Sequence, residues 1–447
     1  MWRPGTDDLE DGEDLEYDPS AYDCLHAFQL EWPCLRCAHL MLERLPSSYQ
    51  LLGSHLPRHS CDILRDELGD CRTQFPHSMY LVAGSQADSA GSNVINVVRL
   101  TQLFKTRRDI DDSDSEASES DSEEEAGRAP VLQCRQIAHH GGVNRIRSQP
   151  QAPHLVATWA ETGHVQVWDI KPQLLALHGD TAAASASAKV ARVPPRQVFS
   201  GHTTEGYALD WSSVAEGRLL SGDCAGAVHL WEPAEGGRWV VSTDTYSGHG
   251  GASVEDLQWS PNEAGVFASC GVDGAVCIWD ARQRAKPALR AAAHDSDVNV
   301  LSWNRMAPAM LASADDEGCF RIWDLRHFAA GGFVASFNYH SAAVTSIEWA
   351  QFDSSTLATS SADNSVAVWD LAVERDAEEE VAAMQQAGNN ALPPAELPPQ
   401  LMFVHQGQRD VKELHWHPQV PGLLCTTAAS GFNVWKPENQ GNLEAAA

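Results

Sequence analysis

The sequence has few basic residues and no long apolar run. It contains 31 Lys and Arg against 61 Asp and Glu in 447 residues, so its formal net charge is −30. Such a chain repels phosphate backbones and anionic headgroups, and we expect no direct nucleic acid or membrane partner. No apolar stretch approaches the length of about 18 residues that a membrane span needs. An acidic segment, not an apolar one, follows Met1–Gly5, so we also expect no signal peptide.

Motifs for catalysis and cofactor binding are also missing. The 11 cysteines form no regular framework, which is typical of reduced, mostly buried thiols. No glycine-rich phosphate loop follows a strand and opens a helix. Cys34 and Cys37, with His55 and His59, suggest zinc, but 17 residues separate the two pairs, more than in the usual finger. We therefore predict that the protein is not an enzyme and has no catalytic residues, metal or cofactor.

Tryptophan, by contrast, is abundant and periodic. Six of the 15 Trp residues follow a His by 28 to 30 positions. An acidic residue comes after each of these Trp except the last, where Lys436 stands. The pairs are His140/Trp168, His202/Trp231, His249/Trp279, His294/Trp323, His340/Trp369 and His405/Trp435. Five further Trp recur 9 to 11 residues after the His: Trp211, Trp259, Trp303, Trp349 and Trp416. This repetition indicates an array of like units.

Each unit has the pattern of a four-stranded sheet. Segments such as "VFASCGVDGAVCIWD" alternate apolar and polar residues between Gly, Asp and Asn turns. The unit length and the Gly-His and Trp-Asp marks are typical of WD repeats. Six units are clear, and residues 78–100 with "PVLQCRQIA" supply a diverged seventh. We predict an all-β, seven-bladed propeller over residues 62–440, closed by N-terminal strand material beside C-terminal strands.

The repeated polar residues have a structural interpretation. Resemblance to WD repeats implies that a His, a strand Ser or Thr, a turn Asp and the Trp form a hydrogen-bonded chain inside each blade. The residues that match this pattern are His249, Ser269, Asp273, Trp279, His340, Asp363 and Trp369. The pattern weakens in two units, where Thr162 replaces the turn Asp and Glu317, beside Asp316, takes its place.

Several segments fall outside the blades. Residues 1–16 form an acidic, disordered tail, and residues 17–35 suggest a helix followed by Glu-Trp-Pro. Residues 36–61 look inserted, either as a lineage-specific loop or as a gene-model artefact. We expect residues 171–196 to be an Ala-rich linker and residues 374–400 an exposed, acidic, proline-rich loop. A groove between the helix and this loop would use Tyr22, Leu25, Phe28, Glu31 and Trp32.

The most acidic segment is residues 109–125, which we predict to be a disordered loop. It either captures basic client proteins or only keeps the chain soluble. Its acidic residues are Asp109, Asp111, Asp112, Asp114, Glu116, Glu119, Asp121, Glu123, Glu124 and Glu125. Its serines have the spacing that acidophilic kinases use: Ser113, Ser115, Ser118, Ser120 and Ser122.

Longer blocks resemble known WD-repeat families. "YDCLHAFQLEWPCL" is similar to the N-terminal helix of histone-binding WD proteins of chromatin-assembly complexes. A second resemblance is to the glutamate-rich WD-repeat family of ribosome-assembly proteins, and it rests on "GHTTEGYALDWS", "RLLSGDCAGAVHLWEP" and "VKELHWHPQVPGLL". Residues 36–61 interrupt this resemblance. That resemblance implies a nucleolar and nuclear chaperone, with cytoplasmic shuttling, whose partners are a basic large-subunit ribosomal protein and core histones.

The propeller would hold its partner on one face. Loops that enter the innermost strands line this top face, and the residue four positions before the second Trp falls at that entry. With their acidic neighbours, the predicted contact residues are Asn144, Glu205, Tyr207, Glu255, Asp256, Asp297, Asn299, Thr345, Asp410 and Lys412. Carboxylates there suit Lys and Arg side chains. We expect a monomer in which the flexible acidic segments attract a basic client that this face then holds.

Two other functions stay open. The protein could be a histone chaperone or a member of a chromatin complex, if the groove beside the N-terminal segment binds a histone helix. It could also be a substrate receptor of a cullin-RING ubiquitin ligase, because Arg282 and Arg326 follow Trp-Asp in the form used for adaptor docking. The same arginines are common at strand exits, so their presence alone does not decide.

Overall fold

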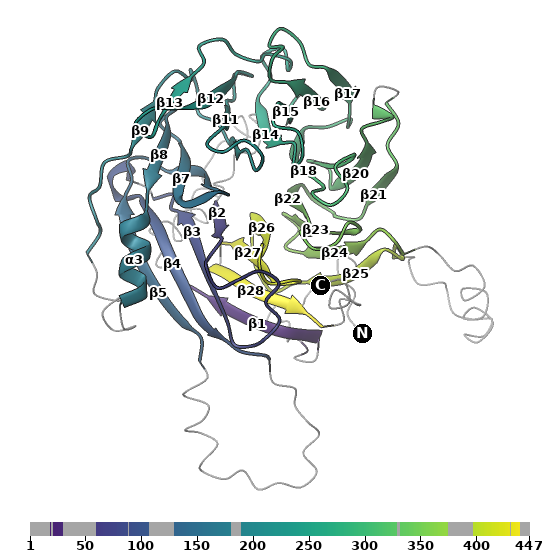
Figure 1. Ribbon diagram of the computed structural model, residues 1–447. Helices are drawn as coiled ribbons and strands as arrows, with labels where there is room; N and C mark the ends of the chain where they lie inside the picture. Colours follow the sequence, from purple (N-terminus) through teal and green to yellow (C-terminus); the bar gives the residue numbers. More distant parts are fainter. Residues whose placement is uncertain are drawn as a thin grey trace, which may run out of the picture.

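The computed structural model of the chain is a ring of blades. It describes residues 18, 21–29, 60–87, 89–106, 129–179, 189–328, 331–373, 397–429 and 431–438. Within these ranges, seven antiparallel four-stranded sheets form a ring (Figure 1), and residues of their inner strands line a central channel. The structure confirms the predicted seven-bladed propeller.

The first six blades each use four consecutive strands. Blade 1 comprises β2 (Cys61–Leu64), β3 (His77–Gly84), β4 (Val94–Leu103) and β5 (Val131–Ala138). Blade 2 comprises β6 (Val143–Gln149), β7 (Ala152–Ala160), β8 (Val165–Asp169) and β9 (Gln197–Phe199). Blade 3 comprises β10 (Ala208–Trp211), β11 (Leu219–Gly222), β12 (Val228–Ala234) and β13 (Arg238–Val241). Blade 4 comprises β14 (Val254–Trp259), β15 (Val266–Gly271), β16 (Ala275–Asp280) and β17 (Leu289–Ala292).

The remaining blades complete the ring. Blade 5 comprises β18 (Val298–Trp303), β19 (Met310–Asp315), β20 (Cys319–Asp324) and β21 (Ala335–Asn338). Blade 6 comprises β22 (Val344–Trp349), β23 (Thr356–Ser361), β24 (Val366–Asp370) and β25 (Leu401–His405). Blade 7 joins the two ends of the chain: β26 (Glu413–Trp416), β27 (Leu424–Ala428), β28 (Gly431–Pro437) and β1 (Tyr22–Phe28). A short 3-10 helix, η2 (Ala90–Ser92), precedes β4.

The predicted N-terminal helix is wrong for residues 22–28, which form β1. Tyr22, Leu25 and Phe28 have helical spacing, but Tyr22, Cys24 and Phe28 are the buried residues and also fit a period of two. The free edge of β28 decides between the two, because β1 supplies its missing hydrogen bonds, with Leu25 opposite Trp435. The N-terminal segment thus closes the ring, as predicted, but as a strand and not from a helix beside it.

Apolar packing lies between the blades. Seven clusters of buried residues form, each shared by two neighbouring blades. The Trp that marks the third strand of the repeat is buried completely or nearly so in blades 2 to 7: Trp168, Trp231, Trp279, Trp323, Trp369 and Trp435. Neighbouring blades therefore stabilise one another mainly by apolar contact, since they share no strand pairing.

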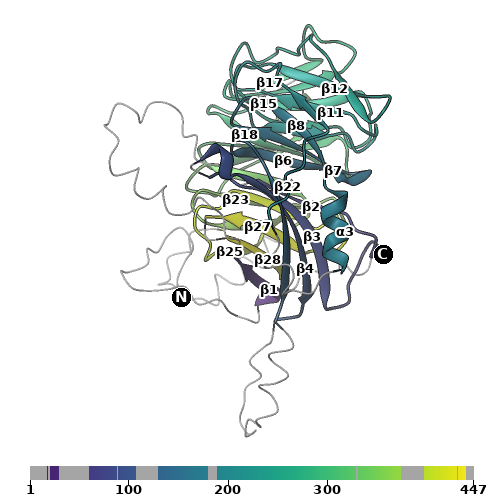
Figure 2. The same cartoon turned by 90° about the vertical axis from the view of Figure 1, so that its left-hand side faces the viewer.

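One helix corrects the predicted linker at 171–196. Residues Lys171–Gly179 form α3, which packs beside β4 and β5 on the outside of blade 1 (Figure 2). Pro172 lies in its first turn, where a missing N–H costs nothing, and Asp169 accepts the Lys171 N–H at 3.1 Å. Leu177 is buried in the blade 1 and 2 cluster. In the described part of the chain no helix has the length and apolar character of a membrane span.

Candidate protein-binding face

The entry face is the side of the ring on which the inner strands β2, β6, β10, β14, β18, β22 and β26 begin. The turn between the second and third strands of a blade lies on this same side. A backbone bond ties the two loops together: Cys224 N–H donates to Glu205 O at 2.9 Å, and Asp316 N–H donates to Asp297 O at 3.0 Å. The fold therefore gathers two loops from each blade around the mouth of the channel.

Carboxylates dominate one sector of the entry face. Glu161 and Glu205 both line a notch of about 370 Å³ between blades 2 and 3. Asn144 holds Glu205 in place, because its amide donates to Glu205 Oε2 at 3.0 Å. In the next blades, burial raises the pKa of Asp297, and the negative charges of Asp316 and Glu255 raise it further. A positive group docked here would relieve that repulsion.

Some of the predicted contact residues have other surroundings. Asp256 lies inside the channel, where it accepts the backbone N–H of Leu301 at 3.2 Å. Lys412 is buried and pairs with Asp410 at 2.5 Å, which cancels the charge of that acidic residue. The Thr345 hydroxyl lies 2.9 Å from that of Ser360. Counting four residues back from the second Trp thus finds the start of each inner strand. Asp256 is one residue further along β14, and because side chains of a strand alternate between its two faces, it points into the channel and not to the rim.

The rest of the predicted rim is mostly buried. Tyr207, Glu255, Asn299 and Asn144 are each less than a tenth exposed. Asn299 donates its amide to Asp316 at 3.2 Å, so it orients an exposed carboxylate without presenting itself. The exposed acidic residues include instead Glu161, Asp295, Asp316 and Glu317, with Glu205 and Asp297 half-buried. The rule missed Glu161 and Asp316 because they belong to the turns between second and third strands.

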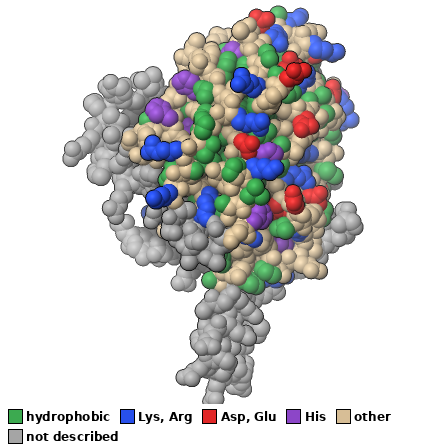
Figure 3. Space-filling view, turned by 60° about the vertical axis from the view of Figure 1, so that its left-hand side comes forward, with side chains coloured by type: hydrophobic (Ala, Val, Ile, Leu, Met, Phe, Trp, Pro, Cys, Tyr) green, Lys and Arg blue, Asp and Glu red, His purple; other side chains and the backbone are tan. Residues whose placement is uncertain are grey.

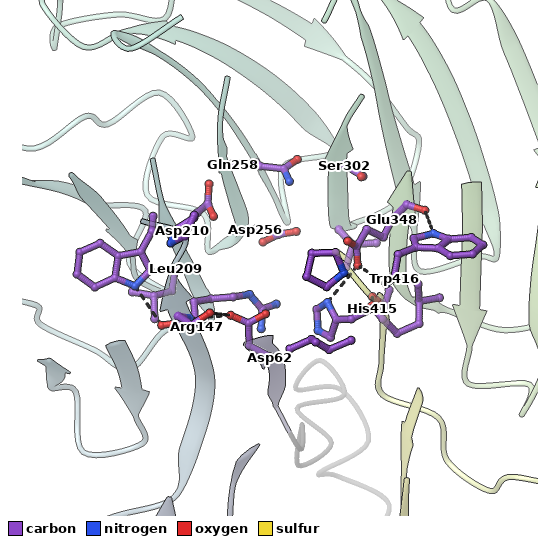
Figure 4. A pocket seen from close by; sticks show the side chains of 18 of the residues that line it. Asp62, Arg147, Leu209, Asp210, Asp256, Gln258, Ser302, Glu348, His415 and Trp416 are labelled. Atoms are coloured by element: carbon purple, nitrogen blue, oxygen red, sulfur yellow. Dashed lines mark hydrogen bonds and ion pairs between the residues drawn. The ribbon is translucent and has the colours of Figure 1, made fainter. Parts of the chain in front are cut away.

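The channel itself is lined by a ring of polar side chains, one from each inner strand. Figure 4 shows these residues around a cavity of about 170 Å³: Asp62, Arg147, Asp210, Gln258, Ser302, Glu348 and His415. Several of them accept a backbone N–H from the next blade, as Asp62 does from Ser148 at 2.6 Å and Asp210 from Trp259 at 2.7 Å. These bonds link inner strands that make no backbone pairing with one another.

A buried ion cluster joins blades 1, 2 and 7. Glu413 receives Arg145 at 2.6 Å and Arg147 at 3.3 Å, and it also accepts the Cys61 N–H at 2.8 Å. Burial by itself would raise the pKa of Glu413, but Arg147 and Arg145 hold it well below its usual range. Sequence reasoning missed this cluster, because nothing in the spacing of residues 145, 147 and 413 indicates that they meet.

The repeated polar residues form hydrogen-bonded chains inside the blades. In blade 4, His249 contacts Asp273 at 2.9 Å and Ser269 at 2.7 Å, and Trp279 donates to Ser269 at 2.9 Å. In blade 6, His340 lies 3.0 Å from Asp363 and 2.8 Å from Thr359, to which Trp369 donates at 3.0 Å. These side chains are committed to the fold and do not face a partner.

Two details of this pattern differ from the sequence prediction. In blade 5 the partner of His294 is Asp315, at 2.8 Å, and Glu317 plays no part, because the Asp stands two residues after the Ser instead of four. In blade 2 the buried His is His139, which lies 3.1 Å from Thr158, whereas His140 is exposed. Both corrections concern residues within two positions of the predicted ones.

Arg282 and Arg326 lie at the ends of the third strands of blades 4 and 5. The guanidinium of each Arg forms an ion pair with the Asp of its own Trp-Asp pair. The distance from Nη2 to the carboxylate Oδ2 is 2.6 Å for both Arg282–Asp280 and Arg326–Asp324. Their side chains are 86% and 72% exposed, so both guanidinium groups are accessible and held in one direction. Elsewhere on the side of the ring, acidic and basic side chains are interspersed (Figure 3).

Several predicted features lie outside the described residues. These are the tail at 1–16, Glu31 and Trp32, nearly all of the apparent insertion, the acidic loop at 109–125 with its serines, and residues 374–396 of the proline-rich loop. The Cys34, Cys37, His55 and His59 set also falls there. Cys61, placed in the insertion, is the first residue of β2.

Two groups of side chains in the described part of the chain have the composition of metal ligands. One is Cys61, Glu413 and His415, at the seam where blades 1 and 7 meet. The other is His294, Asp315 and Cys319 in blade 5. In each group the candidate ligand atoms lie within 4.8 Å of one another. The two differ in their surrounding charge.

Comparison with known proteins agrees with the geometry. Residues 12–103 match the family model of histone-binding protein RBBP4, which also describes a component of the CAF1 complex. Residues 240–280 and 331–370 match the WD domain, G-beta repeat. The chain is 48% identical to Protein HEAT STRESS TOLERANT DWD 1 of Arabidopsis thaliana, over 99% of this chain and 92% of the relative.

Two further relatives are similar along almost the whole chain. Ribosome assembly protein rrb1 of Schizosaccharomyces pombe is 41% identical over 97% of this chain and 84% of its own length. Glutamate-rich WD repeat-containing protein 1 of Dictyostelium discoideum is 42% identical over 98% of this chain and 85% of its own length. Similarity of this extent covers every blade as well as the segments outside the described ranges.

Proposed function

Because the chain belongs to the glutamate-rich WD-repeat family of ribosome assembly proteins, we propose that it is a chaperone for one basic protein of the large ribosomal subunit. It masks the RNA-binding extensions of this client until the client joins the assembling subunit in the nucleolus or nucleus. In this role the protein is a monomeric scaffold and not an enzyme.

The observation that carries this proposal is the acidic sector of the entry face. Glu161 and Glu205 line a notch between blades 2 and 3, and Asp297 and Asp316 add negative charge at blade 5, two blades further around the ring. Lys and Arg side chains form charge-assisted bonds to carboxylates held in this way. A rigid ring also gives up little conformational entropy when it binds an extended segment.

The acidic segments outside the described ranges would act before this face does. Residues 109–125 hold ten carboxylates and no Lys or Arg, so they attract a basic client over distances of about a Debye length. The face then selects among the attracted proteins by shape and by the positions of its carboxylates. Association would therefore depend on salt more strongly than the lifetime of the complex does.

The test is affinity purification of the full-length protein at moderate and at high salt, followed by identification of the bound proteins. A single large-subunit ribosomal protein should survive high salt, and the double variant E161K/D316K should lose it. The matched control is E216K/E263K, because Glu216 and Glu263 are exposed in loops at the opposite ends of β10 and β14. Equal loss in both variants, or none in either, would contradict the proposal.

Histone binding is the second candidate function. The match of residues 12–103 to the histone-binding family model favours it, and core histones are basic enough to use the same acidic face. If histones remain bound at high salt and ribosomal proteins wash off, the protein acts instead as a histone chaperone or as a member of a chromatin complex. Substitution of Tyr22, Leu25 and Phe28 would not test this, because these residues hold β1 in the ring.

The exposed forks of Arg282 and Arg326 favour an additional contact with an adaptor of a cullin-RING ligase. Each Arg is fixed by its Asp and directed outward, as a docking residue must be. R326A should abolish copurification of such an adaptor, while R238A, which removes an exposed Arg that follows no Trp-Asp pair, should not. If both variants still copurify the adaptor, this candidate function is excluded.

A further inference from the structure

Blade 5 brings a thiol into its hydrogen-bonded chain. His294 Nδ1 lies 2.8 Å from Asp315 Oδ2, and Cys319 places its sulfur within 4.8 Å of both ligand atoms. The Cys319 backbone N–H donates to the other oxygen of Asp315 at 2.8 Å, which fixes the two residues relative to each other. One nitrogen, one oxygen and one sulfur therefore converge at the entry face, all less than a tenth exposed.

Blade 3 has the same backbone arrangement without the thiol. His202 contacts Asp223 at 2.9 Å and Ser221 at 2.8 Å, and Ala227 donates its N–H to Asp223 Oδ1 at 2.8 Å. Ala227 thus occupies the position that Cys319 holds in blade 5. The hydrogen-bonded chain of a blade forms without a Cys, so structural stability does not require the one at residue 319.

The surroundings of His294 suit a metal ligand. Its second ring nitrogen, Nε2, lies 2.8 Å from the Ser313 hydroxyl, which also accepts the Trp323 N–H at 2.8 Å. Because Nδ1 lies 2.8 Å from a carboxylate oxygen, it carries the ring proton while no metal is bound. When that proton moves to Nε2, which then donates to Ser313, the lone pair of Nδ1 faces Asp315 and Cys319. Histidine ligands in proteins are usually held by such an outer hydrogen bond, which sets the tautomer and the ring orientation.

Local charge separates this group from the Cys61, Glu413 and His415 group. There, Arg145 and Arg147 already neutralise Glu413 and would repel a cation. In the described part of the chain no arginine or lysine forms an ion pair with Asp315, and the carboxylates of Asp316 and Asp297 lie in the adjoining loops. A divalent cation is therefore attracted to the blade 5 group and opposed at the seam.

We propose that His294, Asp315 and Cys319 bind a Zn²⁺ ion. Nitrogen, carboxylate oxygen and thiolate are ligands that Zn²⁺ accepts in a four-coordinate site, and three protein ligands leave one position for water or for the Ser336 hydroxyl, which lies 3.5 Å from the Cys319 sulfur. As the ion binds, the hydrogen bond between His294 Nδ1 and Asp315 breaks, the ring proton moves to Nε2, and the thiol proton leaves to solvent. The ion ties the loop before β18 to the start of β20 beneath the acidic entry face.

Cobalt(II) is the probe, because its bond to a thiolate gives a near-ultraviolet charge-transfer band that oxygen and nitrogen ligands do not give. The full-length protein with C34S and C37S, which removes the Cys pair outside the described residues, is stripped with a chelator and titrated with Co²⁺. The expected result is a thiolate band that saturates at one equivalent and disappears when Zn²⁺ is added. No band at one equivalent would overturn the proposal.

Three variants identify the ligands. C319A should lose the band, while C224A, which removes a half-buried thiol from the corresponding turn of blade 3, should keep it. S313A should weaken Zn²⁺ binding by roughly 10-fold or more, since it removes the outer hydrogen bond. A band that persists in C319A, or that is lost only in C61A, would place the metal elsewhere and refute the site.

A gain of binding keeps the test decisive even if C319A folds poorly. A227C adds the missing thiol beside His202 and Asp223, so the variant should bind a second equivalent of Co²⁺ with a similar band. Circular dichroism of each variant verifies the fold. Two results together would refute the site: A227C binds only one equivalent of Co²⁺, and the band of the parent protein depends on Cys61. The His, Asp and Cys arrangement inside a blade would then not support metal binding.

Discussion

The Arg145 guanidinium and the Glu413 carboxylate meet at 2.6 Å in the wall of the channel, although they belong to blades 2 and 7. Blade 1 lies between them in the ring, and its Ser60 and Cys61 also bond to Glu413. The contact therefore spans the seam where the N-terminal and C-terminal parts of the chain join. It links two inner strands that make no backbone pairing with β2, the inner strand between them.

We expect E413Q to destabilise the fold by about 3–5 kcal/mol, because it removes the buried carboxylate that both Arg145 and Arg147 contact. Urea unfolding at neutral pH measures the change. E232Q is the control, since Glu232 pairs with Arg218 at 2.9 Å on the surface and its loss should cost less than about 1 kcal/mol. A similar small effect of E413Q would show that the cluster adds nothing to ring closure.

The chain inside blade 4 depends on one hydroxyl that serves two partners. S269A leaves His249 Nε2 and Trp279 Nε1 without their bond in a fully buried place, and we expect a loss of about 1–3 kcal/mol. S269T is the matched control, because Thr359 does the same work in blade 6. Both variants are compared by thermal and urea unfolding, and equal stability of S269A and wild type would contradict this role.

Asp210 should give the fold a pH dependence of opposite sign to that of ordinary acids. Burial raises its pKa to about 7, so the folded state binds a proton that the unfolded state has lost above about pH 4. The unfolding free energy that it contributes therefore falls as pH rises from 4 towards 7. D210N keeps an acceptor for the Trp259 N–H and removes the buried charge.

D210N should therefore raise stability at pH 8 by about 1–3 kcal/mol and by clearly less at pH 5, where most of the penalty has not yet developed. Urea titrations at the two pH values give the comparison. D353N serves as a control, because the pKa of Asp353 is lowered despite its burial, since Thr356 and Ser355 donate to it. An equal gain of D210N at both pH values would mean that the carboxyl group does not titrate as stated.

Deletion of residues 109–125 should slow association with the basic client and flatten its dependence on salt, because the deletion removes ten negative charges. Stopped-flow association at several salt concentrations measures both quantities. The dissociation rate should stay within a few-fold of wild type, since in the proposed mechanism the entry face, and not this loop, holds the client. A chain in which Ser replaces only these ten acidic residues separates charge from loop length.

Charge thus has two roles in this protein, in different places. In the channel, Arg147 and Glu413 compensate each other and stabilise the ring. On the entry face, Asp297 and Asp316 repel each other. Together with the exposed Glu161, they are accessible to a positive group. This division explains why the predicted contact residue Asp256 does not belong to the face, since its carboxylate bonds to the backbone of β18.

The sequence by itself determined the repeat, and with it the number of blades and most of their chemistry. Periodic Trp, His and turn residues are local signals, because the strands of one blade are close together in the chain. His249, Ser269, Asp273 and Trp279 could be assigned to one chain for this reason. Composition also led to the expectation of basic partners, since a net charge of −30 favours basic proteins.

Only the tertiary structure decided the features that join distant segments. Residues 22–28 carry both helical and strand spacing, and the free edge of β28 selected the strand. Asp315 replaced Glu317 because the turn geometry of blade 5 differs by two residues from that of blade 4. Arg145 and Glu413 are 268 positions apart, and no local pattern predicts a contact that exists only when the ring closes.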